Sequence, residues 1–161
     1  MKYWLKDKLR RIKRVADFLP IVWRGRDFDY NYSIDLFHYQ LERTADYLES
    51  DKSYSLNAKQ DARRIRTAIE LGERVFNEDY SSEYFRIIEA EYGPNALIFH
   101  FEDTGEGNGN SYLKYNYEYW DNADEISERL DIERAKSWKK QEKAERIYWD
   151  FLKHNIRHWW D

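Results

Sequence analysis

The spacing of apolar residues constrains the fold of this chain more than any other feature. In four segments apolar residues recur at steps of three and four, which places them on one stripe of an α-helix. These segments cover residues 2–18, about 30–48, about 56–77 and 122–159, and a short helix is expected near 82–91. The connection between the second and third segments is short, so we expect these two helices to be antiparallel neighbours.

Each stripe identifies side chains that we expect to face a core. In chain order they are Leu5, Leu9, Ile12, Ala16 and Leu19; Ile34, Phe37, His38, Leu41, Ala45 and Leu48; Ala62, Ile65, Ala68, Ile69, Gly72, Val75 and Phe76; and Ala144, Ile147, Tyr148, Phe151, Leu152, Ile156 and Trp159. Pro20 is expected to end the first helix, because the residue before a proline avoids the helical region. The polar stretch 136–145 allows a break in the last helix.

Residues 92–120 depart from the helical pattern. The stretches ALIFHF and YLKYNYEYW are rich in residues that favour strands, and they flank the Gly- and Asn-rich stretch EDTGEGNGNS. This arrangement predicts a β-hairpin near 96–118, which needs support from the helices. We therefore expect a mainly α fold, a single domain over residues 1–161 in which about four to five helices form a bundle with a small hairpin insertion.

The composition excludes several classes of protein. There is no cysteine, which rules out disulfides and thiolate metal sites. The first 20 residues lack the long apolar core and the small-residue cleavage site of a signal peptide. No stretch approaches the run of about 20 apolar residues that a membrane-spanning helix needs. We expect a cytoplasmic protein with no membrane partner.

The net charge of −4 hides an asymmetric distribution. Residues 1–26 carry nine Lys/Arg and two Asp, a balance of +7, which leaves −11 for the rest of the chain. This split predicts a basic arm that faces either the acidic body or an anionic partner. A solvated face on a packed helix, a nucleic-acid surface and an acidic partner stay open; for a membrane surface the five-residue apolar stripe lacks bulk.

The connector WRGRDFDYNY is a candidate ligand-binding segment. It interleaves aromatic rings with arginines, which suits a ligand that combines a phosphate with a flat base. Arginines of the third helix could join it. The candidate binding residues are Trp23, Arg24, Arg26 and Tyr30 of the connector and Arg63, Arg64 and Arg66 of the helix. The alternative is a connector that caps the second helix and lays its aromatic rings on the core, with the arginines paired to carboxylates.

His154 and His158 are a candidate metal-binding pair, because residues four apart share one face of a helix. A site needs a third ligand, and His38, His100, Asp161 or the terminal carboxylate are the candidates. The alternative is a surface pair near a helix C-terminus. The GEGNGN run lacks the lysine and Ser/Thr of a phosphate loop and is expected to be a flexible hairpin tip. No catalytic residue, cofactor or bound metal is expected.

Three stretches resemble a group of small uncharacterised proteins encoded by tailed bacteriophages. They are the entry into the second helix at Arg26–Tyr30, the arginine-rich helix at Arg63–Val75 and the closing Phe151–Asp161 with its Trp-Trp-Asp ending. Together these three stretches comprise 29 of the 161 residues. The basic helix 2–18 and the insertion at 104–120 lie outside the pattern. The resemblance implies an accessory protein in the cytoplasm of an infected bacterium, and it brings no catalytic residues.

These observations predict a phage accessory protein that acts by binding rather than catalysis. Its target is either a host or defence protein or an anionic nucleotide signal, which it would sequester. Two other functions stay open. One is a nucleic-acid-binding protein that uses the basic N-terminal helix, with an affinity that falls steeply as salt rises. The other is a metal-dependent enzyme built on His154 and His158. A homo-oligomer is compatible with all three.

Overall fold

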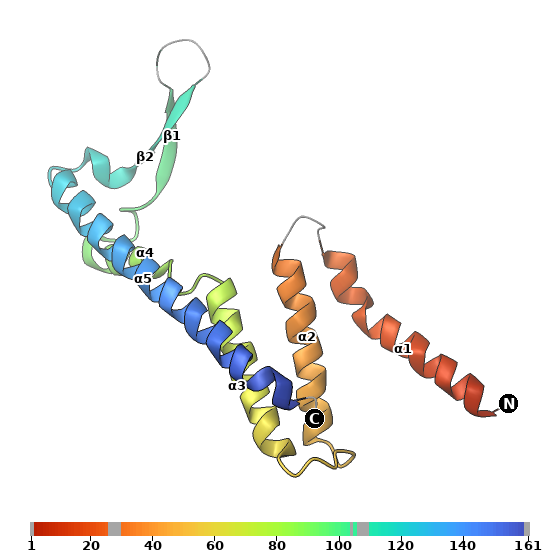
Figure 1. The fold of residues 1–161 in the computed structure, drawn as a ribbon. Helices are drawn as coiled ribbons and strands as arrows, with labels where there is room; N and C mark the ends of the chain where they lie inside the picture. Colours follow the sequence, from red (N-terminus) through yellow and green to blue (C-terminus); the bar gives the residue numbers. More distant parts are fainter. Residues whose placement is uncertain (1, 26–29, 104, 106–109, 160–161) are drawn as a thin grey trace. The chain divides into compact units, whose positions relative to one another are not determined.

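The computed structural model confirms a mainly helical fold with a small β-hairpin (Figure 1). It describes residues 2–25, 30–103, 105 and 110–159. The elements are helices α1 (Lys2–Arg24), α2 (Tyr30–Glu49), α3 (Ala58–Phe76), α4 (Glu83–Tyr92) and α5 (Ala123–Asn155), strands β1 (Phe99–Asp103) and β2 (Ser111–Tyr115), and short 3₁₀ helices η1 (Asn116–Tyr119) and η2 (Ile156–Trp159).

The chain forms two compact units where the sequence predicts a single domain. Unit 1 comprises Met1–Glu70 and Leu152–Asp161, and unit 2 comprises Leu71–Phe151. Helices α3 and α5 each contribute residues to both units. None of the helices in the described ranges combines the length and apolar character that a bilayer-spanning segment needs.

The buried residues of unit 1 lie mainly on α2 and α3, on the predicted stripes. They include Leu41, Ala45 and Leu48 of α2, Ala62, Ile65, Ala68 and Ile69 of α3, and Leu152 and Trp159 near the end of the chain. The buried His38 also matches its predicted place. Ion pairs join the two helices at the surface, since Arg66 of α3 lies 2.6 Å from Asp46 and 3.2 Å from Glu49.

Two predictions for the first helix are wrong. Pro20 does not end it, because α1 continues through the proline to Arg24. A proline has no backbone N–H, but the carbonyls around it still accept bonds, and Gly25 N–H donates to the Ile21 carbonyl at 3.0 Å. Gly25 is required there because a Cβ would lie 2.3 Å from the Tyr32 ring. The predicted inner stripe is also exposed rather than buried, as Leu9 (57%) and Ile12 (64%) show.

Unit 2 has its own hydrophobic core. The buried residues of that cluster are Ile88, Ala96, Leu97, Tyr117, Ile126 and Leu130, from α4, the segment before β1, η1 and the start of α5. Strands β1 and β2 pair antiparallel, with Phe99 opposite Tyr115 and Asp103 opposite Ser111. The Asn116 N–H donates to the Ile98 carbonyl at 2.9 Å, which carries the pairing on toward the core.

The last helix differs from the prediction at two places. It has no break at 136–145, because α5 is continuous over 33 residues. Inside this stretch the buried Gln141 donates from Nε2 to the Val75 carbonyl at 2.8 Å, which fixes α5 to the end of α3 within unit 2. The helix also ends at Asn155, and η2 replaces its predicted last turn. Tyr148, Leu152 and Trp159 are buried as predicted, whereas Ile147 is 46% exposed.

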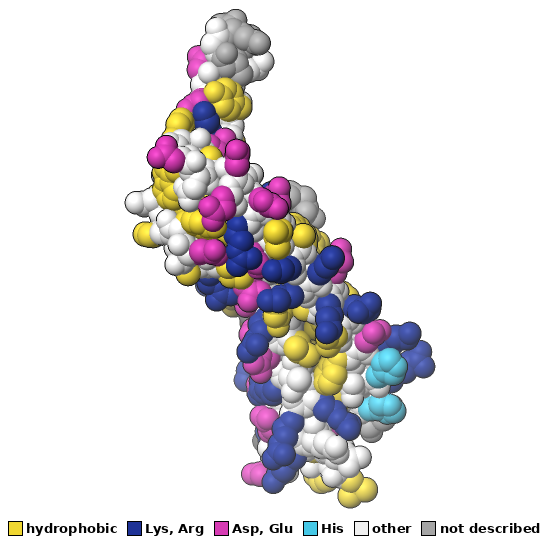
Figure 2. Space-filling view, turned by 90° about the vertical axis from the view of Figure 1, so that its left-hand side faces the viewer, with side chains coloured by type: hydrophobic (Ala, Val, Ile, Leu, Met, Phe, Trp, Pro, Cys, Tyr) yellow, Lys and Arg dark blue, Asp and Glu magenta, His cyan; other side chains and the backbone are white. Residues whose placement is uncertain are grey.

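Basic side chains gather on the surface around α5. Figure 2 shows Lys and Arg side chains midway along the face that it presents, and Asp and Glu side chains prevail nearer the hairpin. Residues 134–146 of α5 contain six Lys/Arg, and three of them pair with carboxylates of unit 2: Arg134 with Asp131 at 3.3 Å, Lys136 with Glu133 at 2.6 Å and Lys140 with Glu83 at 2.5 Å. The body of the chain therefore has a basic band of its own within its acidic surface.

Candidate ligand-binding site

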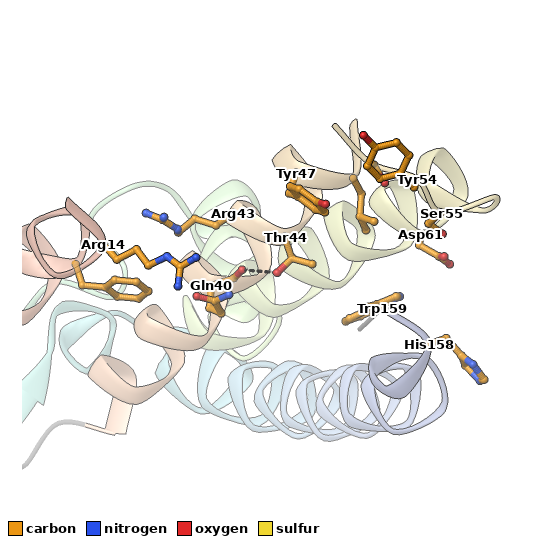
Figure 3. A pocket seen from close by; sticks show the side chains of 13 residues that line it. Arg14, Gln40, Arg43, Thr44, Tyr47, Tyr54, Ser55, Asp61, His158 and Trp159 are labelled. Carbon is orange, nitrogen blue, oxygen red and sulfur yellow. Dashed lines mark hydrogen bonds between the residues drawn. The ribbon is translucent and has the colours of Figure 1, made fainter. Parts of the chain in front are cut away.

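A pocket of about 740 Å³ lies within unit 1 (Figure 3). This volume falls within the range of roughly 300–1,000 Å³ that is usual for small-molecule sites. Four segments form its wall. They are α1 (Arg14, Phe18), α2 (Gln40, Arg43, Thr44, Tyr47, Leu48), the α2–α3 connection with the start of α3 (Ser53, Tyr54, Ser55, Asp61), and η2 (His158, Trp159).

Helical spacing places the α2 side chains on one wall. Gln40, Arg43, Thr44 and Tyr47 follow one another at steps of three, one and three residues, so that they share one face of the helix. The Thr44 hydroxyl donates to the Gln40 carbonyl at 2.9 Å, which holds the threonine side chain against its own helix. This face adjoins the buried stripe of Leu41, Ala45 and Leu48, so the core positions the wall.

Arg43 is a cation of the pocket that several contacts hold in place. Its guanidinium donates to the Asp17 carboxylate at 2.7 Å and lies 5.5 Å from the centre of the Phe18 ring. The hydrogen bond to Asp17 is the main cause that raises the pKa of Arg43 above its ordinary value. Tyr39 donates to the Asp17 backbone carbonyl at 2.8 Å, and its ring meets Phe18 edge-on at 5.0 Å. These contacts attach α1 to α2 beside the pocket.

Two buried polar atoms in the pocket wall have no hydrogen-bond partner among the residues that the structure describes. They are Nε1 of Trp159, whose side chain is 4% exposed, and Oγ of Ser53. A buried donor or acceptor that stays unpaired costs about 1–3 kcal/mol, and native proteins retain few of them. The indole N–H can only donate, so a group that satisfied it would have to be an acceptor.

The two ends of the pocket carry opposite charges. Figure 3 shows Arg14 and Arg43 at one end and Asp61 at the other, with Trp159 and the tyrosines between them. Asp61 is buried and lies in the first turn of α3, where the helix dipole favours a carboxylate, and Arg64 lies 3.3 Å from it. Since Asp17 offsets Arg43 and Arg64 offsets Asp61, the charge left over at the pocket is that of the exposed Arg14.

The predicted ligand-binding residues lie elsewhere in unit 1. Trp23 (86% exposed) and Arg24 are at the end of α1, Tyr30 (64% exposed) begins α2, and Arg26 lies outside the described residues. On α3, Arg63 is exposed, Arg64 pairs with Asp61, and Arg66 pairs with two carboxylates of α2. None of the six described residues lines the pocket. The predicted cluster stays a prediction, and two of its arginines already hold carboxylates.

Sequence reasoning missed Arg14, Arg43 and the tyrosines of the pocket. Arg14 and Phe18 are four residues apart on α1, and this spacing was available in the sequence. The pairing of Asp17 with Arg43 was not, because the two residues are 26 positions apart and no local pattern connects them.

The histidine pair does not form a metal centre with other described residues. His154 lies in the last turn of α5 and His158 in η2, so the change of helix type interrupts the i, i+4 spacing. Across the described ranges no group of three or more His, Cys, Asp or Glu side chains is placed to hold a metal ion. In Figure 3 His158 points away from the other lining side chains. Asp161, one of the candidate third ligands, lies outside the described residues.

A second polar cluster occupies one face of the hairpin in unit 2. His100 Nε2 lies 2.8 Å from the Tyr119 hydroxyl, and the two rings stack. Tyr112 donates to Glu102 at 2.6 Å, and Lys114 lies 3.6 Å from the same carboxylate. The hydrogen bond from Tyr112 is the main cause that lowers the pKa of Glu102. Cross-strand pairs of this kind stabilise a hairpin without further function, so the pocket of unit 1 is the stronger candidate site.

Comparison of the chain with protein-family models, curated proteins and solved structures found no match.

Proposed function

We propose that the protein binds a small anionic ligand with a flat ring system, of the nucleotide class, in the pocket of unit 1. The observation that carries the proposal is the composition of one 740 Å³ pocket: arginines at one end, a carboxylate at the other and aromatic rings between them. A nucleotide has the matching chemistry. Its phosphate suits Arg14 and Arg43, its base suits a ring to stack on, and exocyclic N–H groups suit Asp61.

The charge balance restricts the ligand further. Because Asp17 already offsets Arg43, the pocket presents about one uncompensated positive charge, on Arg14. This favours a ligand with one phosphate group over a triphosphate. The Trp159 Nε1–H, which has no partner in the described part of the chain, offers a donor to a ring nitrogen or a phosphate oxygen. In the phage context that the sequence resemblance implies, such binding would sequester a nucleotide signal rather than convert it.

Isothermal titration calorimetry with nucleoside monophosphates and cyclic nucleotides tests the proposal, with the uncharged nucleoside and inorganic phosphate as comparisons. We expect the nucleotide to bind more tightly than either comparison, since each lacks one half of the recognised chemistry. Chromatography of the ligand after incubation should return it unchanged, because binding without turnover is proposed. The proposal would be refuted if no nucleotide showed saturable binding at millimolar concentration.

Two matched variants locate the site. Arg14→Met removes the uncompensated pocket cation, and Arg63→Met makes the same change at an exposed arginine of α3 outside the pocket. Because Arg14→Met loses a charge-assisted hydrogen bond to the ligand, its affinity for the nucleotide should be about tenfold weaker than that of the wild type. Arg63→Met should keep the wild-type affinity. The reverse pattern would move the site to the cluster of Trp23, Arg24 and the α3 arginines that the sequence predicted.

A further inference from the structure

Helix α1 exposes a broad apolar sector. At about 100° per residue, its apolar residues other than Tyr3, Phe18, Pro20 and Ile21 fall within roughly 140° of the helix circumference. The large members are all more than half exposed: Trp4 (61%), Leu5 (55%), Leu9 (57%), Ile12 (64%), Val15 (66%), Leu19 (54%), Val22 (53%) and Trp23 (86%). An apolar groove of about 420 Å³ follows part of this sector.

The contacts that attach α1 to α2 use a different side of the helix. Asp17 holds Arg43 and accepts from Tyr39, and Phe18 packs against the Tyr39 ring. On the helical wheel these two α1 residues lie outside the apolar sector. The apolar sector is therefore not the surface by which α1 joins unit 1, and it stays open to a partner from outside the chain.

The charges around the sector are almost all positive. Residues 2–24 carry eight Lys/Arg and two Asp, a balance of +6, whereas the rest of the chain sums to −10. Both carboxylates are already paired, Asp7 with Arg11 at 2.9 Å and Asp17 with Arg43 at 2.7 Å. Lys6 and Lys13 lie at one edge of the sector. Lys8 falls inside the sector on the helical wheel, and its ammonium nitrogen lies 3.9 Å from the centre of the Trp4 ring.

We propose that α1 binds the surface of an anionic lipid bilayer, with its apolar sector at the boundary of the headgroups and acyl chains and its lysines and arginines on the lipid phosphates. Helices of this kind combine a strong apolar face, a polar face rich in Lys and Arg, and a low mean hydropathy. Tryptophans at both ends of the helix, Trp4 and Trp23, suit the interfacial region. The helix lies on the bilayer and does not span it.

Charge complementarity favours lipid over a second copy of the helix. Two α1 helices packed face to face would bring +6 against +6, whereas anionic headgroups neutralise the charge. The expectation that the chain has no membrane partner is based on an apolar stripe of only five residues. Trp4, Val15, Val22 and Trp23 widen that stripe in the structure. The side chains changed in the test below lie outside the nucleotide pocket, because neither Leu9 nor Ile12 lines it.

Vesicle co-sedimentation of the full chain tests the proposal. The probes are large vesicles of phosphatidylcholine alone and vesicles that contain roughly one quarter phosphatidylglycerol. We expect sedimentation with the second kind only. The double variant Leu9→Glu/Ile12→Glu should lose at least about tenfold in affinity, because it places carboxylates in the apolar sector. The control Leu56→Glu changes a fully exposed leucine outside α1, and it should bind like the wild type.

A second matched pair tests the electrostatic part. Lys6→Gln on α1 should weaken binding to the anionic vesicles about fivefold, as expected for one basic residue near such a surface. Lys143→Gln on the basic band of α5 should leave it unchanged. Equal losses for both lysines would overturn the assignment to α1. So would equal sedimentation of the double variant and the wild type, or no sedimentation with either kind of vesicle.

Light scattering after size-exclusion chromatography distinguishes the second-copy alternative. We expect the same monomeric mass for the wild type and for Leu9→Glu/Ile12→Glu without lipid. A dimer of the wild type that becomes a monomer in the double variant would overturn the proposal and assign the sector to self-association. Circular dichroism establishes that the variants fold, which is expected because both side chains are exposed.

Discussion

The core of unit 2 makes a quantitative prediction about two isoleucines of the same helix. Ile126 is 0% exposed and belongs to the hydrophobic cluster, whereas Ile132, six residues later on α5, is 44% exposed. Truncation to alanine removes three carbon atoms in each case. At about 0.8 kcal/mol for each buried methylene, the transfer contribution at Ile126 is about 2.4 kcal/mol. The cavity that remains raises the expected loss in the free energy of unfolding to roughly 3–4 kcal/mol.

Truncation of the exposed Ile132 should lower the free energy of unfolding much less. About half of the Ile132 side chain is already in water, so Ile132→Ala is expected to cost roughly 1 kcal/mol. The higher helix propensity of alanine returns a few tenths of a kcal/mol in both variants and cancels in the comparison. Urea unfolding followed by circular dichroism measures the difference in the free energy of unfolding, which should be about 2–3 kcal/mol with an unchanged dependence on urea. A difference below about 1 kcal/mol would refute the assignment of Ile126 to a packed core.

Three further predictions concern polar contacts. Gln141→Met should change the free energy of unfolding by less than about 1 kcal/mol in urea melts. The lost bonds to the Val75 carbonyl and to Glu145 are offset by removing the buried Oε1, which has no partner among the described residues; a loss above about 2 kcal/mol would contradict this. Tyr112→Phe should lower the thermal stability at pH 7, and this loss should shrink as the pH falls. The lowered pKa of Glu102 stabilises the fold above its unfolded value of about 4.3, and this contribution is lost as pH falls through the folded value; a loss that does not change with pH would count against it. Asp17→Asn should tighten nucleotide binding by calorimetry about two- to tenfold by releasing Arg43, at a cost of at most about 1 kcal/mol in stability, and weaker binding would argue against an anion at that end.

Periodicity predicted the helices well because it depends only on local chain geometry. The stripes of α2 and α3 are buried where expected, with Leu41 and Ile65 both at 0% exposure. The hairpin was also predicted, since strand-forming residues on both sides of a Gly-rich turn are a local signal. The pocket was not predicted, because it depends on contacts such as that between Asp17 and Arg43, which lie far apart in the sequence.

Helices α1 and α3 show what periodicity leaves open. Both have an apolar stripe, but that of α3 is buried and that of α1 is exposed. The two helices also differ in net charge. The balance of α3 is +2, and its Arg66 pairs with two carboxylates of α2, whereas the balance of α1 is +6 and both of its carboxylates are already paired.

An amphipathic helix that packs on its own chain can pair its charged residues with neighbouring side chains. The positive charges at the edges of the exposed apolar face of α1 would be complementary to anions that adjoin an apolar phase. A lipid surface provides both in one layer, which is why the vesicle experiment is the most direct test of α1.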